Sequence, residues 1–349
     1  MATIQIFSGK DYSLLDTIQA TAPREWVLNS VSTCNWEMST LDPKCNERNL
    51  QYGNIVYIQH PTLPDWVGFL DSDPNADGRT WSSEGKLKVH ALSAEVLFEY
   101  CDLEIETMRG TAGTLYVKII NKLNEQQVVA PLFQGDIYLD GAERTHTAGG
   151  SALSSVETIG NRSDNDWNVT AEIEGNHIRL LANWYASLGD AQDRLLSENN
   201  LEFKDDIFRE TGRIRNVIRG YGDASTSNTR VTVVMENEDS IGLYGKRSAS
   251  IVFSGNRELS TLKENVRTAL KNYSFPRKSF SFDIVNQDGL YNLVGLGNTF
   301  PFHLDKVGFS ENGFGTSGRI RITAFSFDDE TENSKITTNA EVLEDAQNS

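Results

Sequence analysis

The sequence predicts a mainly β protein in which an α+β insertion separates two small β-barrels. Apolar and polar side chains alternate with a two-residue period, the pattern of a half-buried strand, in two distant stretches, 30–38 and 280–285. Each stretch is followed by a Gly-Asn pair that leads into an apolar run, at 53–58 and at 297–302. Such short patterns also match by chance, so an internal duplication and a coincidence are both open at this point.

The first predicted barrel covers residues 1–97. Cys34, Trp36 and Met38 share the packed face of its clearest strand, and Asp42-Pro43 ends that strand. Turn signals and short apolar runs then follow in the order of an antiparallel meander. Further strands are expected at 4–6, 26–28, 55–58, 66–70 and 86–92.

The predicted α+β insertion covers residues 98–205. Leu115, Ile119 and Leu123 recur at a spacing of four, which is the apolar stripe of a short amphipathic helix. Residues 141–155 are small and polar, so we expect an exposed loop there. The period of residues 178–181 fits a strand and a helix equally well.

The second predicted barrel covers residues 206–327. Ile214, Asn216 and Ile218 alternate along its first strand, with partner strands expected at 231–234 and 319–323. A helix is expected at about 260–274, with Ser260 as its N-cap, Leu262, Val266, Ala269 and Tyr273 on one side, and Pro276 as its stop. Residues 328–349 are acidic and polar, so we expect a loosely ordered tail or a docking arm.

The overall charge limits the possible partners. The chain of 349 residues has 32 basic and 49 acidic residues, a formal net charge of −17, which argues against a surface that grips the phosphate backbone of DNA. No apolar run is long enough to cross a bilayer, and the N-terminus has no signal peptide, so we expect synthesis in a cytoplasm.

Metal and disulfide sites are not expected. The three cysteines include no CxxC pair and are interpreted as thiols, with a disulfide between Cys34 and Cys45 as the alternative. The oxygen-bearing side chains at every second position from Asp71 to Asp77 resemble a calcium loop. However, Ala76 stands where that loop needs glycine and Ser82 where it needs glutamate, so we interpret these residues as a hairpin turn between barrel strands.

No catalytic or cofactor-binding motif is present, so we expect no enzyme activity: the sequence has no P-loop, no GxSxG and no HExxH. A carbohydrate-active hydrolase is the first alternative and would need carboxylates that converge in a cleft. A glycan-binding module is the second and would need an exposed row among Trp81, Trp167 and Trp184. Trp36 and Trp66 are interpreted as packing residues.

Several motifs, taken in order, are similar to one family. They are Leu-Asp-Pro at 41–43, the run from Leu50 to Val56, Trp-Val-Gly-Phe at 66–69, the run from Asp239 to Arg247, the helix after Ser260, and 318–323. Their order resembles phage tail-tip and baseplate hub proteins, including the N-terminal region of siphophage tail-associated lysins and the hubs of contractile injection systems.

This resemblance implies a tail-tip protein of the virion. It implies a homotrimer in which two tube-like barrels per chain form a ring of six positions, joining the sixfold tail tube to the threefold tip. The implied partners are the distal tail protein, the tape measure protein, tip or receptor-binding proteins, and DNA that passes through the channel without specific binding. Many relatives carry a C-terminal lysin domain, and none is visible here, so cell-wall cleavage would fall to other proteins. An acidic channel wall would repel passing DNA, although the charge could equally lie outside.

Overall fold

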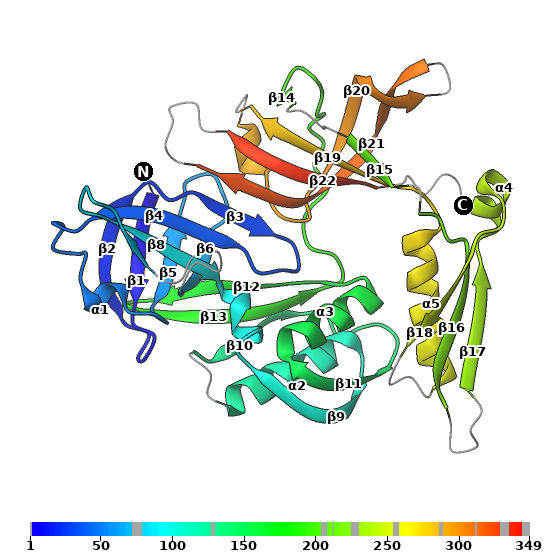
Figure 1. Cartoon of the computed structure of the whole chain (residues 1–349), viewed down its shortest axis with the longest axis horizontal. Helices are drawn as coiled ribbons and strands as arrows, with labels where there is room; N and C mark the ends of the chain where they lie inside the picture. Colours follow the sequence, from blue (N-terminus) through cyan, green and yellow to red (C-terminus); the bar gives the residue numbers. More distant parts are fainter. Residues whose placement is uncertain are drawn as a thin grey trace.

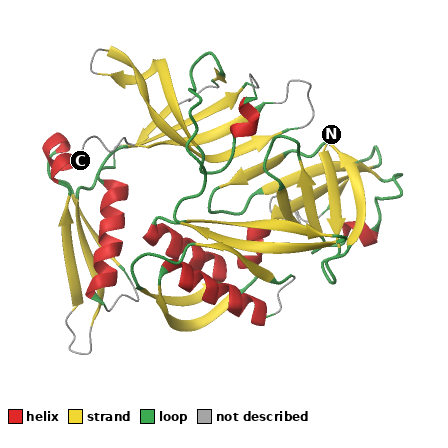
Figure 2. Cartoon of the chain, turned by 180° about the vertical axis from the view of Figure 1, so that it is seen from behind, coloured by secondary structure: helices red, strands yellow, loops and turns green. Residues whose placement is uncertain are grey.

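The computed structural model describes most of the chain. The described ranges are 2–71, 79–126, 130–203, 208–211, 213–224, 230–253, 258–285, 289–310, 313–328 and 335–343. Strands dominate, and the long helices lie outside the main sheet (Figures 1 and 2). The prediction of a mainly β protein is therefore confirmed. Within these ranges, no helix is long and apolar enough to cross a membrane.

The first β-half, residues 2–93, follows the predicted meander. Cys34, Trp36 and Met38 are all buried on one face of β4, as their alternation predicted. The elements are β1 (Ala2–Phe7), β2 (Leu14–Ala20), β3 (Arg24–Val27), β4 (Thr33–Ser39), α1 (Glu47–Leu50), β5 (Ile55–Gln59), β6 (Trp66–Leu70), β7 (Thr80–Trp81) and β8 (Lys86–Ser93).

The insertion, residues 94–185, packs helices against small sheets. Leu115, Ile119 and Leu123 are buried along α2, which confirms the predicted stripe. Residues 178–181, which fitted two structures, belong to strand β13. The elements are η1 (Ala94–Phe98), β9 (Asp102–Gly110), α2 (Ala112–Glu125), β10 (Leu132–Ile137), β11 (Arg144–Ser151), α3 (Ala152–Ser163), β12 (Asp166–Glu174) and β13 (His177–Tyr185).

The prediction of an exposed loop at 141–155 is wrong. Strand β11 occupies most of this stretch and pairs with β9, and α3 begins at Ala152. The prediction failed because the apolar positions that fix α3, Val156 and Ile159, lie beyond the stretch that was considered.

The second β-half contains β14 (Leu201–Glu202), β15 (Phe208–Thr211), β19 (Arg277–Ile284), η2 (Leu290–Leu293), β20 (Thr299–Ser310), β21 (Gly313–Phe327) and β22 (Ile336–Leu343). A separate lobe, residues 214–275, is inserted between β15 and β19. It contains β16 (Val217–Ala224), β17 (Arg230–Glu236), α4 (Glu238–Tyr244), β18 (Ser248–Val252) and α5 (Leu259–Tyr273). Figure 1 shows the lobe at the right, with α5 between its sheet and the insertion.

Helix α5 confirms the strongest helix prediction in the chain. Leu262, Val266 and Ala269 are buried against the sheet of the lobe, as their spacing predicted, whereas Tyr273 is exposed. The N-cap is Glu258, which makes no side-chain capping bond, so the assignment of this role to Ser260 is wrong. Tertiary packing of the apolar face sets this helix rather than its cap.

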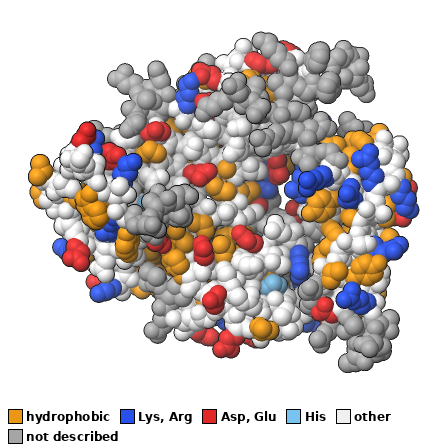
Figure 3. Space-filling view, in the orientation of Figure 1, with side chains coloured by type: hydrophobic (Ala, Val, Ile, Leu, Met, Phe, Trp, Pro, Cys, Tyr) orange, Lys and Arg blue, Asp and Glu red, His pale blue; other side chains and the backbone are white. Residues whose placement is uncertain are grey.

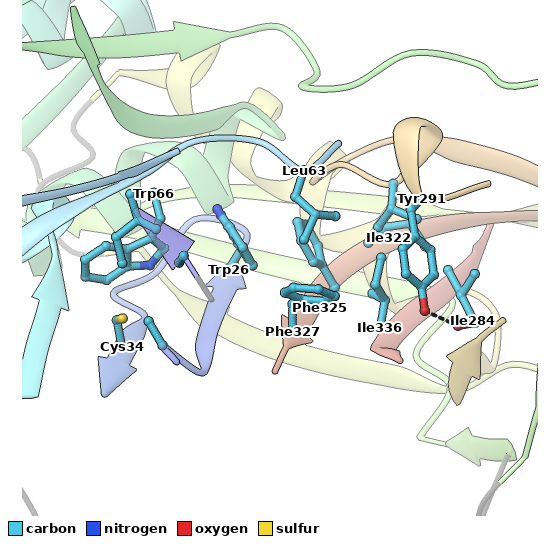
Figure 4. Close-up of a cluster of buried hydrophobic side chains, with 14 of the residues drawn as sticks. Trp26, Cys34, Leu63, Trp66, Ile284, Tyr291, Ile322, Phe325, Phe327 and Ile336 are labelled. Carbon is cyan, nitrogen blue, oxygen red and sulfur yellow. Dashed lines mark hydrogen bonds between the residues drawn. The ribbon is translucent and has the colours of Figure 1, made fainter. Parts of the chain in front are cut away.

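The two β-halves share one sheet and one core, which differs from two separate barrels. Strand β3 pairs with β21, so a single hydrogen-bonded path runs through both halves and, over the described strands, does not close on itself. At this joint the ring of Trp26 stacks on Phe325, with 4.6 Å between the ring centroids. Figure 4 shows the core continuing across it, from Trp66 of β6 to Ile336 of β22.

The prediction of a loosely ordered arm at 328–349 is wrong for residues 336–343. These residues form β22, which lies between β19 and β21 in the sheet. Ile336 and Ala340 point into the core and are almost fully buried. The acidic composition was misleading because the outward positions of this strand, Thr337, Asn339 and Glu341, are polar and hide the two apolar inward positions, Ile336 and Ala340.

Charge is distributed unevenly along the chain. Residues 213–278 contain twelve Lys and Arg against six Asp and Glu, so this segment is net positive in a chain of net charge −17. Figure 3 shows Lys and Arg gathering over the lobe, at the right of the view. The net charge therefore does not describe every surface of the protein, and the acidity belongs to the β-halves and the insertion.

Acid should destabilise the protein through His146 of β11. This side chain is buried, and burial together with the positive charge of Arg162 lowers its pKa from 6.5 to about 4. Because the folded pKa lies below the unfolded one, the stability that His146 contributes is full above pH 6.5 and is lost as the pH falls toward 4.

We expect this loss to reach about 3 kcal/mol. Urea unfolding at several pH values gives the free energy of unfolding as a function of pH for the wild type and for His146→Leu. The carboxylates titrate in both proteins, so the difference between the two curves measures the contribution of His146. Parallel curves between pH 6.5 and 4 would contradict the prediction.

Candidate functional site

The two β-halves have the same strand order, and this is the feature most relevant to function. The antiparallel order β4-β8-β6-β5 in the first half is matched by β19-β22-β21-β20 in the second. The register also matches, because three side chains face one another in a row across the first three strands of each set. These rows are Cys34, Ala91 and Leu70 in the first half and Phe280, Ala340 and Ile322 in the second.

The Gly-Asn pairs occupy equivalent corners with the same backbone bonds. Gly53 N donates to the carbonyl of Leu70 at 2.9 Å, and Leu70 N donates to the carbonyl of Asn54 at 2.9 Å. The same two bonds join the pair at 297–298 to Ile322, at 2.8 and 3.0 Å. Both glycines have left-handed φ angles, 85° and 77°.

The asparagine side chains repeat the match. Asn54 Nδ2 donates to the carbonyl of Asn49 at 3.1 Å, and Asn298 Nδ2 donates to the carbonyl of Leu293 at 2.8 Å, five residues earlier in both cases. Each Oδ1 accepts a backbone N–H from a distant segment, Gly9 or Asp190. Matching strand order, register and side-chain bonds favour a duplication over a coincidence.

Substitution of Gly297 should therefore be costly. A Cβ at this position would lie 2.0 Å from the carbonyl oxygen of Leu188, in a backbone conformation that alanine rarely adopts. We expect Gly297→Ala to lower the free energy of unfolding by about 2 kcal/mol or more, measured by urea titration. Gly242→Ala is the control, since this glycine lies in α4 with open space around it. Equal stability of the two variants would contradict the account.

A buried ion pair holds the second β-half, the insertion and the first β-half together. Arg321 of β21 pairs with Asp166 of β12, and the two side chains are only 16% and 5% exposed. Asp166 also accepts the N–H of Leu188 at 2.6 Å and the side-chain amide of Asn29 at 3.0 Å. Asn29 in turn accepts the N–H of Trp167 at 2.8 Å. Groups from three parts of the chain therefore meet at one carboxylate.

The same sheet position is occupied differently in the first β-half. Ile55 and Thr299 each follow directly after the Gly-Asn pair of their half. Phe69 is paired with Ile55 and Arg321 with Thr299, so Phe69 and Arg321 occupy equivalent positions. Phe69 is buried in the apolar core that the first β-half shares with the insertion. The insertion is thus fixed to one half by apolar packing and to the other by an ion pair.

A cleft of about 980 Å³ lies where the three parts meet. Asp65, Glu95 and Asp190 are among the residues that line it, and a hydrolase would need two such carboxylates to flank the bond that it cleaves. Two of these carboxylates have structural partners: Asp65 accepts the hydroxyl of Tyr57 at 2.5 Å, and Glu95 accepts the N–H of Val169 at 2.8 Å. Burial, with the bond to Asp65, raises the pKa of Tyr57 to about 12, and burial raises the pKa of Glu95.

The tryptophans do not form the row that a glycan platform would need. Trp167 and Trp184 are buried in the core of the insertion, and Trp81 alone of the three is exposed. Trp36 and Trp66 are buried, as expected for packing residues. The observation that would have favoured a glycan-binding module is therefore missing from these three positions.

The remaining candidate positions are resolved in part. All three cysteines are thiols, with Cys34 and Cys101 buried and Cys45 half-buried, so Cys34 and Cys45 are not bonded. Of the calcium-like stretch, only Asp71 belongs to the described residues, and 72–78 lie outside them. Among the described residues, no group of His, Cys, Asp or Glu is arranged to hold a metal ion.

Comparison with known proteins identifies the fold. No protein-family model matches the sequence, and no curated protein matches it. Three solved structures align with nearly the whole chain. Prophage tail protein gp18 from Listeria monocytogenes EGD-e has a TM-score of 0.60 at 10% identity, covering 97% of this chain and 94% of that one. The 43 kDa tail protein of prophage MuSo2 from Shewanella oneidensis has a TM-score of 0.58 at 9% identity, covering 97% of this chain and 98% of that one. The tail protein from Neisseria meningitidis MC58 has a TM-score of 0.57 at 11% identity, covering 97% of this chain and 96% of that one.

The similarity extends through both β-halves, the insertion and the lobe, because coverage is almost complete in both directions. At these identities the likeness concerns the fold. The resemblance that the order of the sequence motifs indicated is confirmed at that level: this chain has the fold of phage tail proteins.

Proposed function

We propose that this chain is a structural protein of a phage tail tip or baseplate, a hub that assembles as a homotrimeric ring around a channel. The observation that carries the proposal is the repeated strand order, β4-β8-β6-β5 and β19-β22-β21-β20, with its matching register. Three chains with two equivalent units each supply six similar positions, which suits an adaptor between sixfold and threefold parts.

The joint within the chain supports a ring further. The two units meet head to tail, because β3 of the first half pairs with β21 of the second. A head-to-tail contact that repeats between chains closes into a ring when its rotation allows. The ion pair between Arg321 and Asp166 joins the second β-half to the insertion, which shares a core with the first β-half. The orientation of one unit relative to the other is therefore held within one chain.

The proposed partners are those of a hub. They are the distal tail protein on the tube side, tip or receptor-binding proteins on the other, and the tape measure protein and DNA in the channel. The protein would act by geometry rather than by catalysis. The predicted divisions at residues 97/98, 205/206 and 327/328 stay predictions, with tube-like units as the proposed assembled form of the two β-halves.

The solution mass of the purified chain tests the trimer. We expect light scattering over a concentration series to give a stable species of three times 38.9 kDa. A trimer requires contacts between chains, so the mass should fall to that of one chain in denaturant. A protein that stays monomeric at all concentrations and cleaves or binds a polysaccharide would favour the carbohydrate-active alternative and its cleft carboxylates.

A further inference from the structure

The sheet of the lobe has one covered face and one open face. Helix α5 packs on the covered face, where side chains of all three strands join those of the helix in one apolar cluster. Figure 1 shows α5 between this sheet and the insertion, so the other face is turned away from the insertion of its own chain. We call it the outer face of the lobe. Its two central cross-strand rows are Val234, Arg219 and Ser250, and Thr232, Tyr221 and Val252.

The outer face combines exposed apolar side chains with cations. Val234 and Val252 are 47% and 56% exposed, and the exposed Arg219 lies directly opposite Val234. Arg230 is exposed on the same side of β17. A carboxylate on that side, Glu236, is already paired with Lys246 at 2.7 Å. Apolar side chains next to arginines are typical of a surface that docks another protein, and the cations favour an acidic partner.

The chain itself carries an acidic surface of the matching kind. The insertion, residues 94–185, contains fourteen Asp and Glu against six Lys and Arg. Negative charge accumulates at one end of it, since burial and the charge of Glu99 raise the pKa of Glu157 there. Residues 99–105, which we call the acidic strip, expose three carboxylates and two apolar side chains: Glu99, Asp102 and Glu104, and Tyr100 and Ile105.

The acidic strip lies away from the lobe of its own chain. It includes the start of β9, whereas Arg109, near the end of β9, pairs with Glu258 of the lobe at 3.2 Å. At a rise of about 3.3 Å per residue, the strand keeps Asp102 roughly 20 Å from Arg109. The contact between lobe and insertion within one chain therefore uses neither the strip nor the outer face. A contact that repeats head to tail around an axis needs two such different, complementary surfaces on each chain.

We propose that the outer face of the lobe docks on the acidic strip of the neighbouring chain. This inference rests on the proposed trimer and names a contact between its chains that lies outside the two β-halves. Arg219 and Arg230 pair with carboxylates of the strip, and the two exposed valines cover Ile105. The contact explains why one segment of an acidic chain is net positive. It also lets chains of net charge −17 attract one another locally when they assemble.

Charge reversal on each surface tests the contact. Arg219→Glu with Arg230→Glu makes the outer face acidic, Asp102→Lys with Glu104→Lys makes the strip basic, and a further protein carries all four changes. The matched control for the first pair is Lys263→Glu with Lys10→Glu, which changes the net charge equally at exposed cations outside the outer face. Light scattering over a concentration series, at low and high salt, gives the dissociation constant of each trimer. Circular dichroism checks that each variant is folded.

We expect reversal on either surface to raise the dissociation constant of the trimer about tenfold over that of the control, because like charges then face one another. The protein with all four changes should return to within about threefold of the control, since opposite charges face again. High salt should reduce these differences, because it screens exposed charges.

Outer-face and strip variants that form the trimer as well as the control overturn this inference alone. A loss that the four changes together do not restore also overturns it, because the outer face would then have another partner. A wild-type chain that stays monomeric at all concentrations overturns the proposed ring, and this inference with it.

Discussion

Ala340→Asp is expected to cost about 3 kcal/mol or more and to leave little folded protein. Ala340 lies in the middle of β22, is 1% exposed, and faces Phe280 on one side and Ile322 on the other. A carboxylate there would be buried among apolar side chains, where the charged form is strongly disfavoured. Urea unfolding followed by circular dichroism measures the change.

Two matched variants make this prediction specific. Asn339→Asp changes the neighbouring residue on the exposed face of the same strand and should leave stability within about 0.5 kcal/mol of the wild type. Ala91→Asp changes the equivalent position of the first β-half, which is also buried, and should cost about as much as Ala340→Asp. If Ala340→Asp were tolerated as well as Asn339→Asp, residues 336–343 would not be the inner strand described here.

Arg321→Met is expected to cost about 3 to 5 kcal/mol, because it leaves the carboxylate of Asp166 buried without its cation. The pair joins residues 155 positions apart in the sequence and links the second β-half to the insertion. We therefore also expect a lower yield of the proposed trimer, measured by light scattering at a temperature where the variant is still folded.

A double-mutant cycle separates the pair from its surroundings. Arg321→Met combined with Asp166→Asn should cost less than the sum of the single changes, since the unpaired buried charge is removed. Lys86→Met is the control: it removes a cation from an exposed pair with Glu37 and should cost about 0 to 1 kcal/mol. Additive costs for Arg321 and Asp166 would contradict the account of the joint.

Local elements could be predicted where the period is clean. The buried alternation of β4, the stripe of α2 and the apolar side of α5 all follow from spacing within one element. Packing of one face against a core enforces such patterns, so they survive in the sequence. The Gly-Asn corners were visible for a similar reason, because a left-handed φ favours glycine.

The arrangement of the elements could not be predicted from spacing. Nothing within β3 or β21 indicates that Trp26 stacks on Phe325, and nothing in Asp166 indicates Arg321 as its partner. These contacts join segments far apart in the chain, and only the folded sheet defines them. Strand β22 was missed because its outward residues, Thr337, Asn339 and Glu341, are polar, so that the stretch resembles a solvated tail in composition.

The duplication is the point where sequence and structure support each other most directly. A weak pattern of glycine, asparagine and alternating apolar residues gains weight once strand order, register and asparagine bonds are found to match. It also explains why β22 is needed, since this strand takes the place that β8 has in the first half.

Electron micrographs of the purified assembly, viewed along its symmetry axis, test the central claim most directly. Our account predicts a closed threefold ring with six similar densities around an open channel, two from each chain. A closed ring with only three densities around the channel, or an assembly without a threefold axis, would contradict it.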